Sequence, residues 1–306
     1  MTATIAVPTK TSVLPLEHRV TLKNILYATD FSPAAENAMK YAGALAKSFG
    51  AKLYALHVQE PANYALPPEL WQSAEQACKE QMTQLRNAMV RAFPGVLSET
   101  IVGEGGLWPA LALAAEKYRI DLIVVGTRGR TGLGKLVLGS QAEEILRRAQ
   151  TPVLTVGPRV HPEKWPSGKF ASILLATDFG PASGAAMHYA LSFAEENQAK
   201  LTLIHVVDLH KIANVVNREE VIETCERKLR DMVPEEAKAW CTPHYVVQLG
   251  EPVEKIFETT ERTDADLIVL GVHQPEGVPG AATHLPIATV HKLLAHAATP
   301  VLTVRG

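Results

Sequence analysis

A glycine-rich loop in the first half of the chain has the residue types that bind anions. Its glycines are Gly126, Gly129, Gly132, Gly134 and Gly139. Glycine lets a backbone adopt positive φ and approach a ligand closely. The helical pattern that starts at Ser140 would offer unpaired N–H groups and the positive end of its dipole. Arg128, Arg130 and Lys135 add positive charge. The loop therefore favours an anionic ligand, and a chain of phosphates is the natural one.

Two further segments would reach the same place. Thr29-Asp30 follows the first apolar run of the chain, and Val58-Gln59 follows the second. If these runs are parallel strands, their carboxyl ends share one edge of the sheet. Open parallel sheets bind ligands beyond that edge, at the point where the strand order reverses. We therefore expect Thr29, Asp30 and Val58 to lie beside the glycine-rich loop.

Strand and helix patterns alternate through this half. Residues 33–48 carry apolar side chains at helical spacing, with Ser32 as the expected N-cap and Gly50 after the last turn. The other expected elements are strands at 24–28, 52–58, 97–102, 121–125 and 152–156, and helices at about 68–93, 108–118 and 140–148. This alternation is typical of a parallel sheet that is covered by helices on both faces.

The same pattern returns about 148 residues later. Ile25–Phe31 and Ala51–Val58 have close counterparts in Ile173–Phe179 and Ala199–Val206. So long a period indicates two whole domains rather than a solenoid, whose repeats run at roughly 20–50 residues. We expect two flavodoxin-like or Rossmann-like α/β domains, each with a five-stranded, mainly parallel sheet in the order 3-2-1-4-5 and helices on both faces.

The expected organisation follows from the repeat and from a segment rich in proline and glycine between the copies. It comprises a tail at 1–22, a first domain at 23–157, a linker at 158–169 and a second domain at 170–306. Second-domain strands are expected near 172–176, 201–207, 245–248, 267–271 and 301–304.

The composition of the 306-residue chain is that of an ordinary globular protein, with 47% hydrophobic and 20% charged residues. A net charge of −2 gives no electrostatic reason to expect nucleic acid or an anionic membrane as partner. We find no apolar run long enough to span a membrane and no signal-peptide pattern. Three separated cysteines without a CxxC pair argue against a disulfide framework or a zinc site. We therefore expect a cytoplasmic protein without a metal site.

The loop and the first-strand turn together resemble a known family. Gly126-x2-Gly129-x9-Gly139-Ser140, downstream of Ala28-Thr-Asp-Phe-Ser32, is similar to the motif of the ATP-binding universal stress proteins. The resemblance covers about 22–157 and 170–305, so the whole chain looks like a tandem of two such domains. It implies that ATP, with or without Mg²⁺, is the cofactor.

The resemblance also implies residue roles in the first domain. Asp30, after Thr29, and the backbone of Val58 would hold the adenine and its surroundings. Gly126, Thr127 and Gly129 would line the ribose and phosphates, with Arg128 and Arg130 beside them. Gly139, Ser140 and Gln141 would hold the phosphates at the helix start.

The second copy departs from this motif. Gln274 replaces the second glycine, Ile287-Ala288 replaces the Gly-Ser pair, and the loop between them contains Pro275, Pro279 and Pro286. A β-branched side chain would stand where a close backbone approach is needed, and one hydroxyl is lost. A helix starting earlier, at Thr283 or His284, would also close the pocket. We predict that the second domain binds ATP weakly or not at all.

Structural explanations compete with several of these roles. Asp30 could simply form the turn after its strand, and Ser140 with Glu143 could form a capping box. Arg128 and Arg130 could be solvated loop charges. His57 and His205 occupy matched positions in the two copies, and we interpret both as partly buried histidines that are bonded to the backbone rather than as metal ligands.

We therefore expect a stress or signalling protein in which ATP acts as a switch or cofactor. We expect no dedicated catalytic reaction, since no P-loop lysine motif is present. A slow ATPase and an interaction scaffold with a vestigial nucleotide site remain alternatives. In the family that the chain resembles, domains pair through their fifth strands. The linker is long enough for such pairing within one chain, and the sequence leaves open whether chains also form a homodimer.

Overall fold

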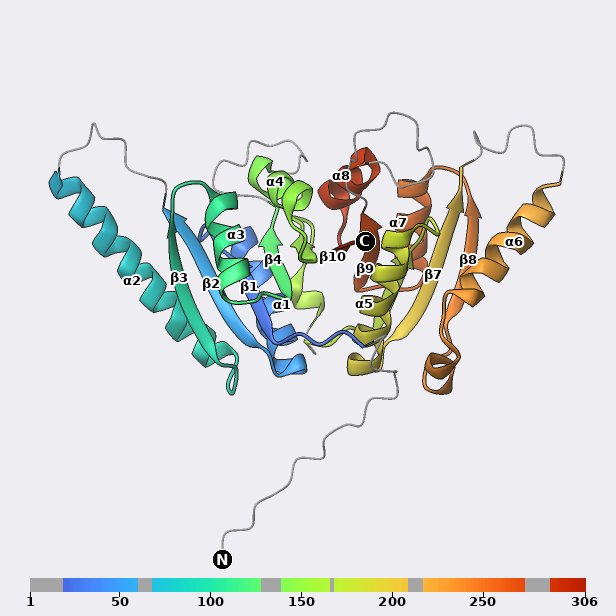
Figure 1. Cartoon of the computed structure of the whole chain (residues 1–306), viewed down its shortest axis with the longest axis horizontal. Helices are drawn as coiled ribbons and strands as arrows, with labels where there is room; N and C mark the ends of the chain where they lie inside the picture. Colours follow the sequence, from blue (N-terminus) through green and yellow to red (C-terminus); the bar gives the residue numbers. More distant parts are fainter. Residues whose placement is uncertain (1–18, 60–67, 128–138, 166–167, 209–216, 273–286) are drawn as a thin grey trace, which may run out of the picture.

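The computed structural model describes residues 19–59, 68–127, 139–165, 168–208, 217–272 and 287–306. In each half, strands alternate with helices (Figure 1). The first half contains β1 (Asn24–Ala28), α1 (Pro33–Phe49), β2 (Lys52–Gln59), α2 (Pro68–Ala92), β3 (Ser98–Glu104), α3 (Leu107–Lys117), β4 (Leu122–Gly126), α4 (Ser140–Arg148) and β5 (Val153–Val156). The second half contains β6 (Ser172–Ala176), α5 (Pro181–Asn197), β7 (Lys200–Val207), α6 (Arg218–Asp231), β8 (His244–Leu249), α7 (Pro252–Arg262), β9 (Leu267–Val272), α8 (Ile287–His296) and β10 (Val301–Arg305).

The strands form one ten-stranded sheet in the order β3-β2-β1-β4-β5-β10-β9-β6-β7-β8. Each half has the expected order 3-2-1-4-5, and all strand pairs within a half are parallel. The halves join through β5 and β10, which pair antiparallel with Leu154 opposite Leu302. The expected fold class is therefore confirmed, and the expected pairing of fifth strands occurs within the chain.

The first helix shows why the local sequence folds as it does. The Ser32 hydroxyl accepts a hydrogen bond from the Ala35 N–H, Pro33 occupies the first turn, and Gly50 ends the helix at a φ of 65°. These are favourable choices for an N-cap, a first helical position and a left-handed C-cap. The apolar stripe of α1, which includes Ala38 and Ala42, is buried against the sheet.

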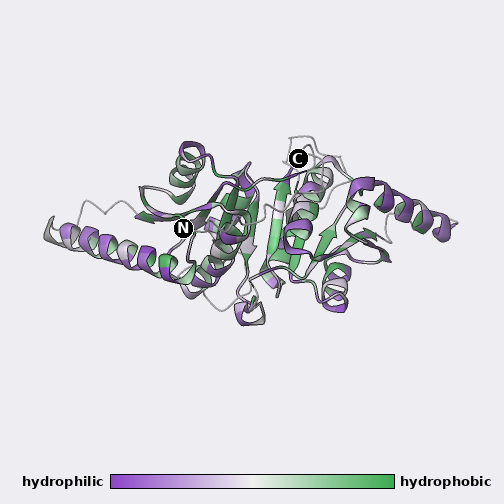
Figure 2. Cartoon of the chain, turned by 90° about the horizontal axis from the view of Figure 1, so that it is seen from below, coloured by the Kyte–Doolittle hydropathy of each residue, from purple (hydrophilic) through white to green (hydrophobic). Residues whose placement is uncertain are grey.

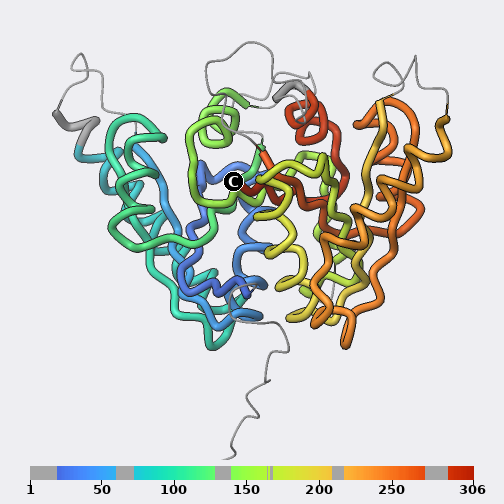
Figure 3. The backbone as a smooth tube through the Cα atoms, turned by 45° about the vertical axis from the view of Figure 1, so that its right-hand side comes forward, coloured from blue at the N-terminus to red at the C-terminus, as the bar shows by residue number. Residues whose placement is uncertain are grey.

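Side chains on both faces of the sheet form the core. On one face, a single cluster runs through both halves and includes α1, α5, Leu154 and Leu302. On the other face, α3 and α4 cover β1 and β4, while α7 and α8 cover β6 and β9. Figure 2 shows the central strands as hydrophobic and the outer helices as largely hydrophilic. The two expected domains thus share one core layer, and Figures 1 and 3 show them side by side.

The segment before β1 packs against the second half, and the segment before β6 packs against the first half. The Val20 N–H donates to the Ser192 hydroxyl of α5 at 2.8 Å, and Leu22 is buried. In return, Trp165 and Phe170 stack on Tyr41 of α1. The described end of the assigned tail and the assigned linker, which includes the 3₁₀ helix Pro162–Lys164, are therefore packed parts of the structure.

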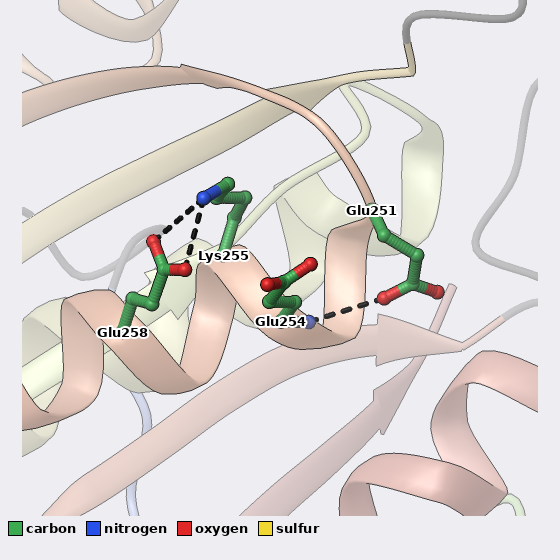
Figure 4. Close-up of polar contacts among 4 residues, drawn as sticks. All are labelled: Glu251, Glu254, Lys255 and Glu258. Carbon is green, nitrogen blue, oxygen red and sulfur yellow. Dashed lines mark hydrogen bonds and ion pairs between the residues drawn. The ribbon is translucent and has the colours of Figure 1, made fainter.

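The start of α7 shows another use of local charge (Figure 4). The Glu251 carboxylate accepts from the Glu254 N–H at 3.1 Å and serves as N-cap, and Lys255 pairs with Glu258 at 2.8 Å on the exposed side. A carboxylate at this end of a helix is stabilised by the helix dipole. In the described part of the chain, no helix is long and apolar enough to cross a membrane.

Candidate functional site

The turn after β1 is held by its own side chains. The Thr29 hydroxyl accepts from the Phe31 N–H at 3.0 Å, and one Asp30 carboxylate oxygen accepts from the Ser32 N–H at 2.9 Å. Phe31 has a φ of 60°, which is uncommon for a residue other than glycine. The same turn, with Phe179 at a φ of 63°, recurs in the second half. Asp30 therefore has a structural role in the turn, in agreement with the simpler of the two interpretations.

Histidines near the carboxyl ends of β2 and β7 support these turns. His57 Nδ1 lies 2.9 Å from the Thr29 carbonyl oxygen, and the His57 ring lies 4.6 Å from the Phe31 ring, between centroids. His205 makes the matched contacts with Thr177, at 2.8 Å, and with Phe179. The interpretation of both histidines as backbone-bonded residues is confirmed. The next residue, Val58, is half-buried within β2.

The end of β4 lies against the start of α1. A Cβ on Gly126 would come within 2.8 Å of the Ala34 carbonyl carbon and oxygen. The matched Gly271 has even less room, at 2.3 Å from the Ala182 carbonyl carbon. Close packing of helix on strand therefore requires glycine in both copies. Gly126 would be needed whether or not a ligand binds, which spacing alone did not reveal.

Thr127 is the first residue after β4, and its side chain is almost completely buried. Its N–H donates to the Val156 carbonyl at 3.1 Å, and its own carbonyl accepts from the Gly139 N–H at 3.2 Å. The Thr127 hydroxyl is buried without a hydrogen-bond partner among the residues that the structure describes. Buried polar atoms are seldom left unpaired in native proteins, so this hydroxyl is consistent with a polar ligand at the end of β4.

The start of α4 differs from the sequence-based expectation. The N-cap is Gly139, whose carbonyl accepts from the Glu143 N–H at 2.9 Å, and Ser140 is the first helical residue. The predicted Ser140 capping box is therefore wrong, because the extended backbone of Gly139 already occupies the N-cap position. No side chain within the described residues caps this helix. Ser140 and Gln141 are exposed, and the first N–H groups of the helix have no intrahelical acceptors.

Close backbone contacts connect these segments at one edge of the sheet. Asp30 lies two residues before the N-cap of α1, the first turn of α1 touches Gly126, and Thr127 bonds to Gly139. Arg128, Gly129 and Arg130, together with Lys135, lie outside the described residues. Strand order reverses between β1 and β4, so the described candidates lie where a doubly wound sheet binds its ligand.

One difference between the copies was missed in the sequence. Ser183 in α5 is buried, and its hydroxyl donates to the Asp178 carboxylate at 2.8 Å. The matched position in α1 is Ala35, which has no hydroxyl. The second copy thus uses its turn aspartate to bind its own helix. Aligning the helix starts would have exposed this difference.

The rest of the second-domain motif is described only in part. Gly271 lies within β9, and α8 is described from Ile287 onward. Gln274, the three prolines and the two candidate earlier helix starts, Thr283 and His284, lie outside the described residues. Among the residues that are described, no group of three or more histidine, cysteine, aspartate or glutamate side chains could hold a metal ion.

This arrangement defines a class: tandem doubly wound α/β domains in which the strand order reverses between the first and fourth strands. The chain belongs to the universal stress protein family, whose model matches it twice, at residues 21–157 and 169–305. A universal stress protein of Mycolicibacterium smegmatis is 27% identical over 301 residues, which cover 92% of this chain and 96% of that relative.

Other relatives match one half or the fold. A universal stress protein of Methanocaldococcus jannaschii is 36% identical over 138 residues, which cover 44% of this chain and 81% of that protein. The crystal structure of a universal stress protein from Archaeoglobus fulgidus has a TM-score of 0.69 at 19% identity, with coverage of 92% of this chain and 98% of that one. At that identity the structural likeness concerns the fold alone.

Proposed function

We propose that the first domain binds ATP at the edge between β1 and β4, and that occupancy rather than turnover is its function in a stress response. The contact between Thr127 and Gly139 carries the proposal. It brings a helix start that no described side chain caps next to a buried hydroxyl that lacks a described partner. Exposed N–H groups at a helix start attract phosphate.

The fit to a phosphate chain depends on space as well as on charge. A Cβ on Gly139 would lie 3.1 Å from the Thr127 carbonyl oxygen, so a larger side chain would crowd the junction between β4 and α4. Ser140 Oγ and the N–H groups of Ser140 and Gln141 would hold phosphate oxygens. Asp30 and the Val58 backbone, at the neighbouring strand ends, would hold the adenosine. Arg128, Gly129 and Arg130 complete the proposed set on the sequence motif alone.

The second domain is proposed to leave its corresponding edge without nucleotide. The bond from Ser183 to Asp178 and the replacement of Gly-Ser by Ile287-Ala288 support this proposal. One ATP per chain is therefore expected. The cytoplasmic location also remains a prediction.

A sequence swap between the two copies tests the proposal. The double variant G139I/S140A places the second-domain pair in the first domain and is expected to weaken ATP binding at least about tenfold, which corresponds to about 1.4 kcal/mol. The matched control, I287G/A288S, makes the reverse exchange and should leave affinity and stoichiometry unchanged, because Gln274 and the prolines remain. Isothermal titration calorimetry with ATP measures both quantities, and circular dichroism checks the fold.

The same samples decide between binding and the alternatives. Mass spectrometry of small molecules released from gently purified protein should find adenine nucleotide at about one per chain. No binding by the wild-type chain, with or without Mg²⁺, would leave the interaction scaffold as the better explanation. Multiple-turnover phosphate release that G139I/S140A abolishes would instead establish an ATPase.

A further inference from the structure

Helix α4 packs against the hydrophobic clusters of both domains. Ile145 and Ala149 pack into the core of the first half, around α3 and β4. On the same apolar stripe, Ala142 belongs to the cluster of the second half that contains Val290 and Leu294 of α8, and Leu146 packs against both clusters. Figures 1 and 3 both show α4 and α8 next to each other across the middle of the molecule. The helix that starts at the candidate phosphate site therefore rests partly on the second domain.

A charged side chain from the second domain also holds the far end of this helix. Arg305, at the end of β10, donates from Nη2 to the Leu146 carbonyl oxygen at 2.6 Å. That carbonyl is among the last four of α4, which have no intrahelical donor. A cation here also meets the negative end of the helix dipole. Arg305 is half-buried, and its Nη1 atom is buried without a hydrogen-bond partner among the described residues. Burial lowers the pKa of Arg305.

The symmetric position in the first domain has no such side chain. Gly157 aligns with Arg305, and Leu294 in α8 aligns with Leu146. A Cβ on Gly157 would lie 3.2 Å from the Ala297 carbonyl oxygen and 3.5 Å from that of Leu294. The backbone of the first domain thus approaches the end of α8 but offers no cation. The hydrogen bond from Arg305 to Leu146, which we call the clamp, therefore has no counterpart at Gly157. It acts on α4, the helix that follows the complete glycine motif.

We propose that Arg305 is a positioning residue for nucleotide binding, through which the second domain fixes α4 and its phosphate-binding start. The inference rests on the proposed ATP site in the first domain. Helix α4 has nine residues, and so short a helix is not stable without tertiary contacts. A helix that is ordered before the ligand arrives binds more tightly than one that must be ordered during binding. The domain without a complete motif thereby contributes to the affinity of the other.

Two variants of Arg305 and one control variant of Arg148 test the role of Arg305 in the full-length chain. Arg305→Gln removes the clamp and should weaken ATP binding by at least about fivefold, the lower end of typical coupling between sites. Arg305→Lys retains a cationic donor and should restore most of the affinity. Arg148→Gln is the control, since it removes the same charge from the same helix end, where Arg148 pairs with Glu144 of α4 itself at 3.4 Å. Its affinity should match wild type.

Hydrogen exchange in the absence of nucleotide gives an independent readout. Amides from Glu143 to Ala149 should exchange faster in Arg305→Gln than in wild type, while those of α5 should not change. Wild-type affinity in Arg305→Gln would overturn the inference, whether or not exchange in α4 is faster. Wild-type protein that binds no ATP would refute the proposed function and with it the nucleotide role of Arg305. Faster exchange in α4 would then still show that Arg305 holds the helix.

Discussion

All three cysteine side chains are buried, with exposed fractions of 6% for Cys78, 9% for Cys225 and 6% for Cys241. Burial raises the pKa of each thiol. Because the thiolate is the reactive form, we expect native protein to react slowly with a disulfide reagent near pH 8, and denatured protein to titrate three thiols at once. A rapid first-phase reaction of the folded chain would contradict this prediction.

Asp266 gives a pH dependence whose direction follows from its surroundings. Its carboxylate accepts from the N–H groups of Ala171, at 2.7 Å, and Ser172, at 3.2 Å, at the start of β6. Burial is the largest influence and raises the pKa of Asp266. The folded state then binds this proton more tightly than the unfolded state does, so stability falls as pH rises from the ordinary carboxyl pKa of about 4 through the raised value.

The test is the difference in unfolding free energy between wild type and Asp266→Asn, measured by urea titration at several pH values. This difference should decline across that window, because the asparagine does not ionise. A difference that stays constant would show that the hydrogen bonds to Ala171 and Ser172 offset burial, and one that grows with pH would show that they outweigh it.

The sequence was enough to single out the residues at the sheet edge between β1 and β4, but not to predict all their structural roles. The matched positions of His57 and His205 were enough to predict backbone bonding. The capping-box pattern at Ser140 offered a structural explanation for this serine that is wrong, because the cap depends on the dihedral angles of Gly139, which a sequence does not contain. Gly126 is fixed by its distance to Ala34, a contact between segments far apart in the chain.

Two glycines inside helices show how packing overrides helix propensity. A Cβ at Gly184 in α5 would meet nothing within 4 Å, whereas a Cβ at Gly43 in α1 would lie 2.1 Å from the Phe93 ring. Gly184→Ala should therefore stabilise the protein by about 0.5–1 kcal/mol. Gly43→Ala should destabilise it by about 1–3 kcal/mol, because Phe93 must move.

Chemical denaturation of the two variants measures both effects under identical conditions. Since both changes are the same substitution within a 17-residue helix, they differ mainly in the space around the new methyl group. Changes of the same sign would mean that Phe93 moves away at little cost, or that the helices differ in a way that the packing does not explain.

The elements themselves were largely predictable. Strands of the second half, such as β6 at Ser172–Ala176, agree with the apolar runs, and the helical stripe of α1 is buried as expected. The contacts of α4 were not predictable, because its pattern cannot show that Ala142 and Leu146 also contact another domain. Long-range partners of this kind leave no mark on local periodicity.

The aromatic contacts between the halves should make the molecule unfold as one unit. Phe170 is 1% exposed and stacks with Tyr41 of α1 and with Phe193 of α5, at centroid distances of 6.4 and 6.2 Å. Phe170→Ala should lower the free energy of unfolding by about 3–5 kcal/mol. Circular dichroism and tryptophan fluorescence should report coincident transitions in both proteins. Two separate transitions in wild type would contradict a shared core.

At the scale of the whole molecule, the repeat predicted both domains and their strand order. It did not predict that Trp165 of the assigned linker would pack on the first half, because the proline and glycine content of this segment is typical of an exposed one. Similarly, Leu22 was placed in the tail, but it is buried in the shared core. Single apolar residues in irregular segments become informative only when the chain that covers them is known.

The antiparallel pairing of β5 with β10 has a genetic consequence. Two separate copies of one domain are encoded by the same gene, so a substitution at the nucleotide edge would alter both partners at once. Covalent fusion removes that constraint, because each position of the pair can mutate alone while the shared seam keeps the partners together. The pairing of β5 with β10, in which Leu154 lies opposite Leu302, thus joins two domains of different sequence permanently and in a fixed one-to-one ratio. In such a pair, one member can lose its ligand and specialise in supporting the other.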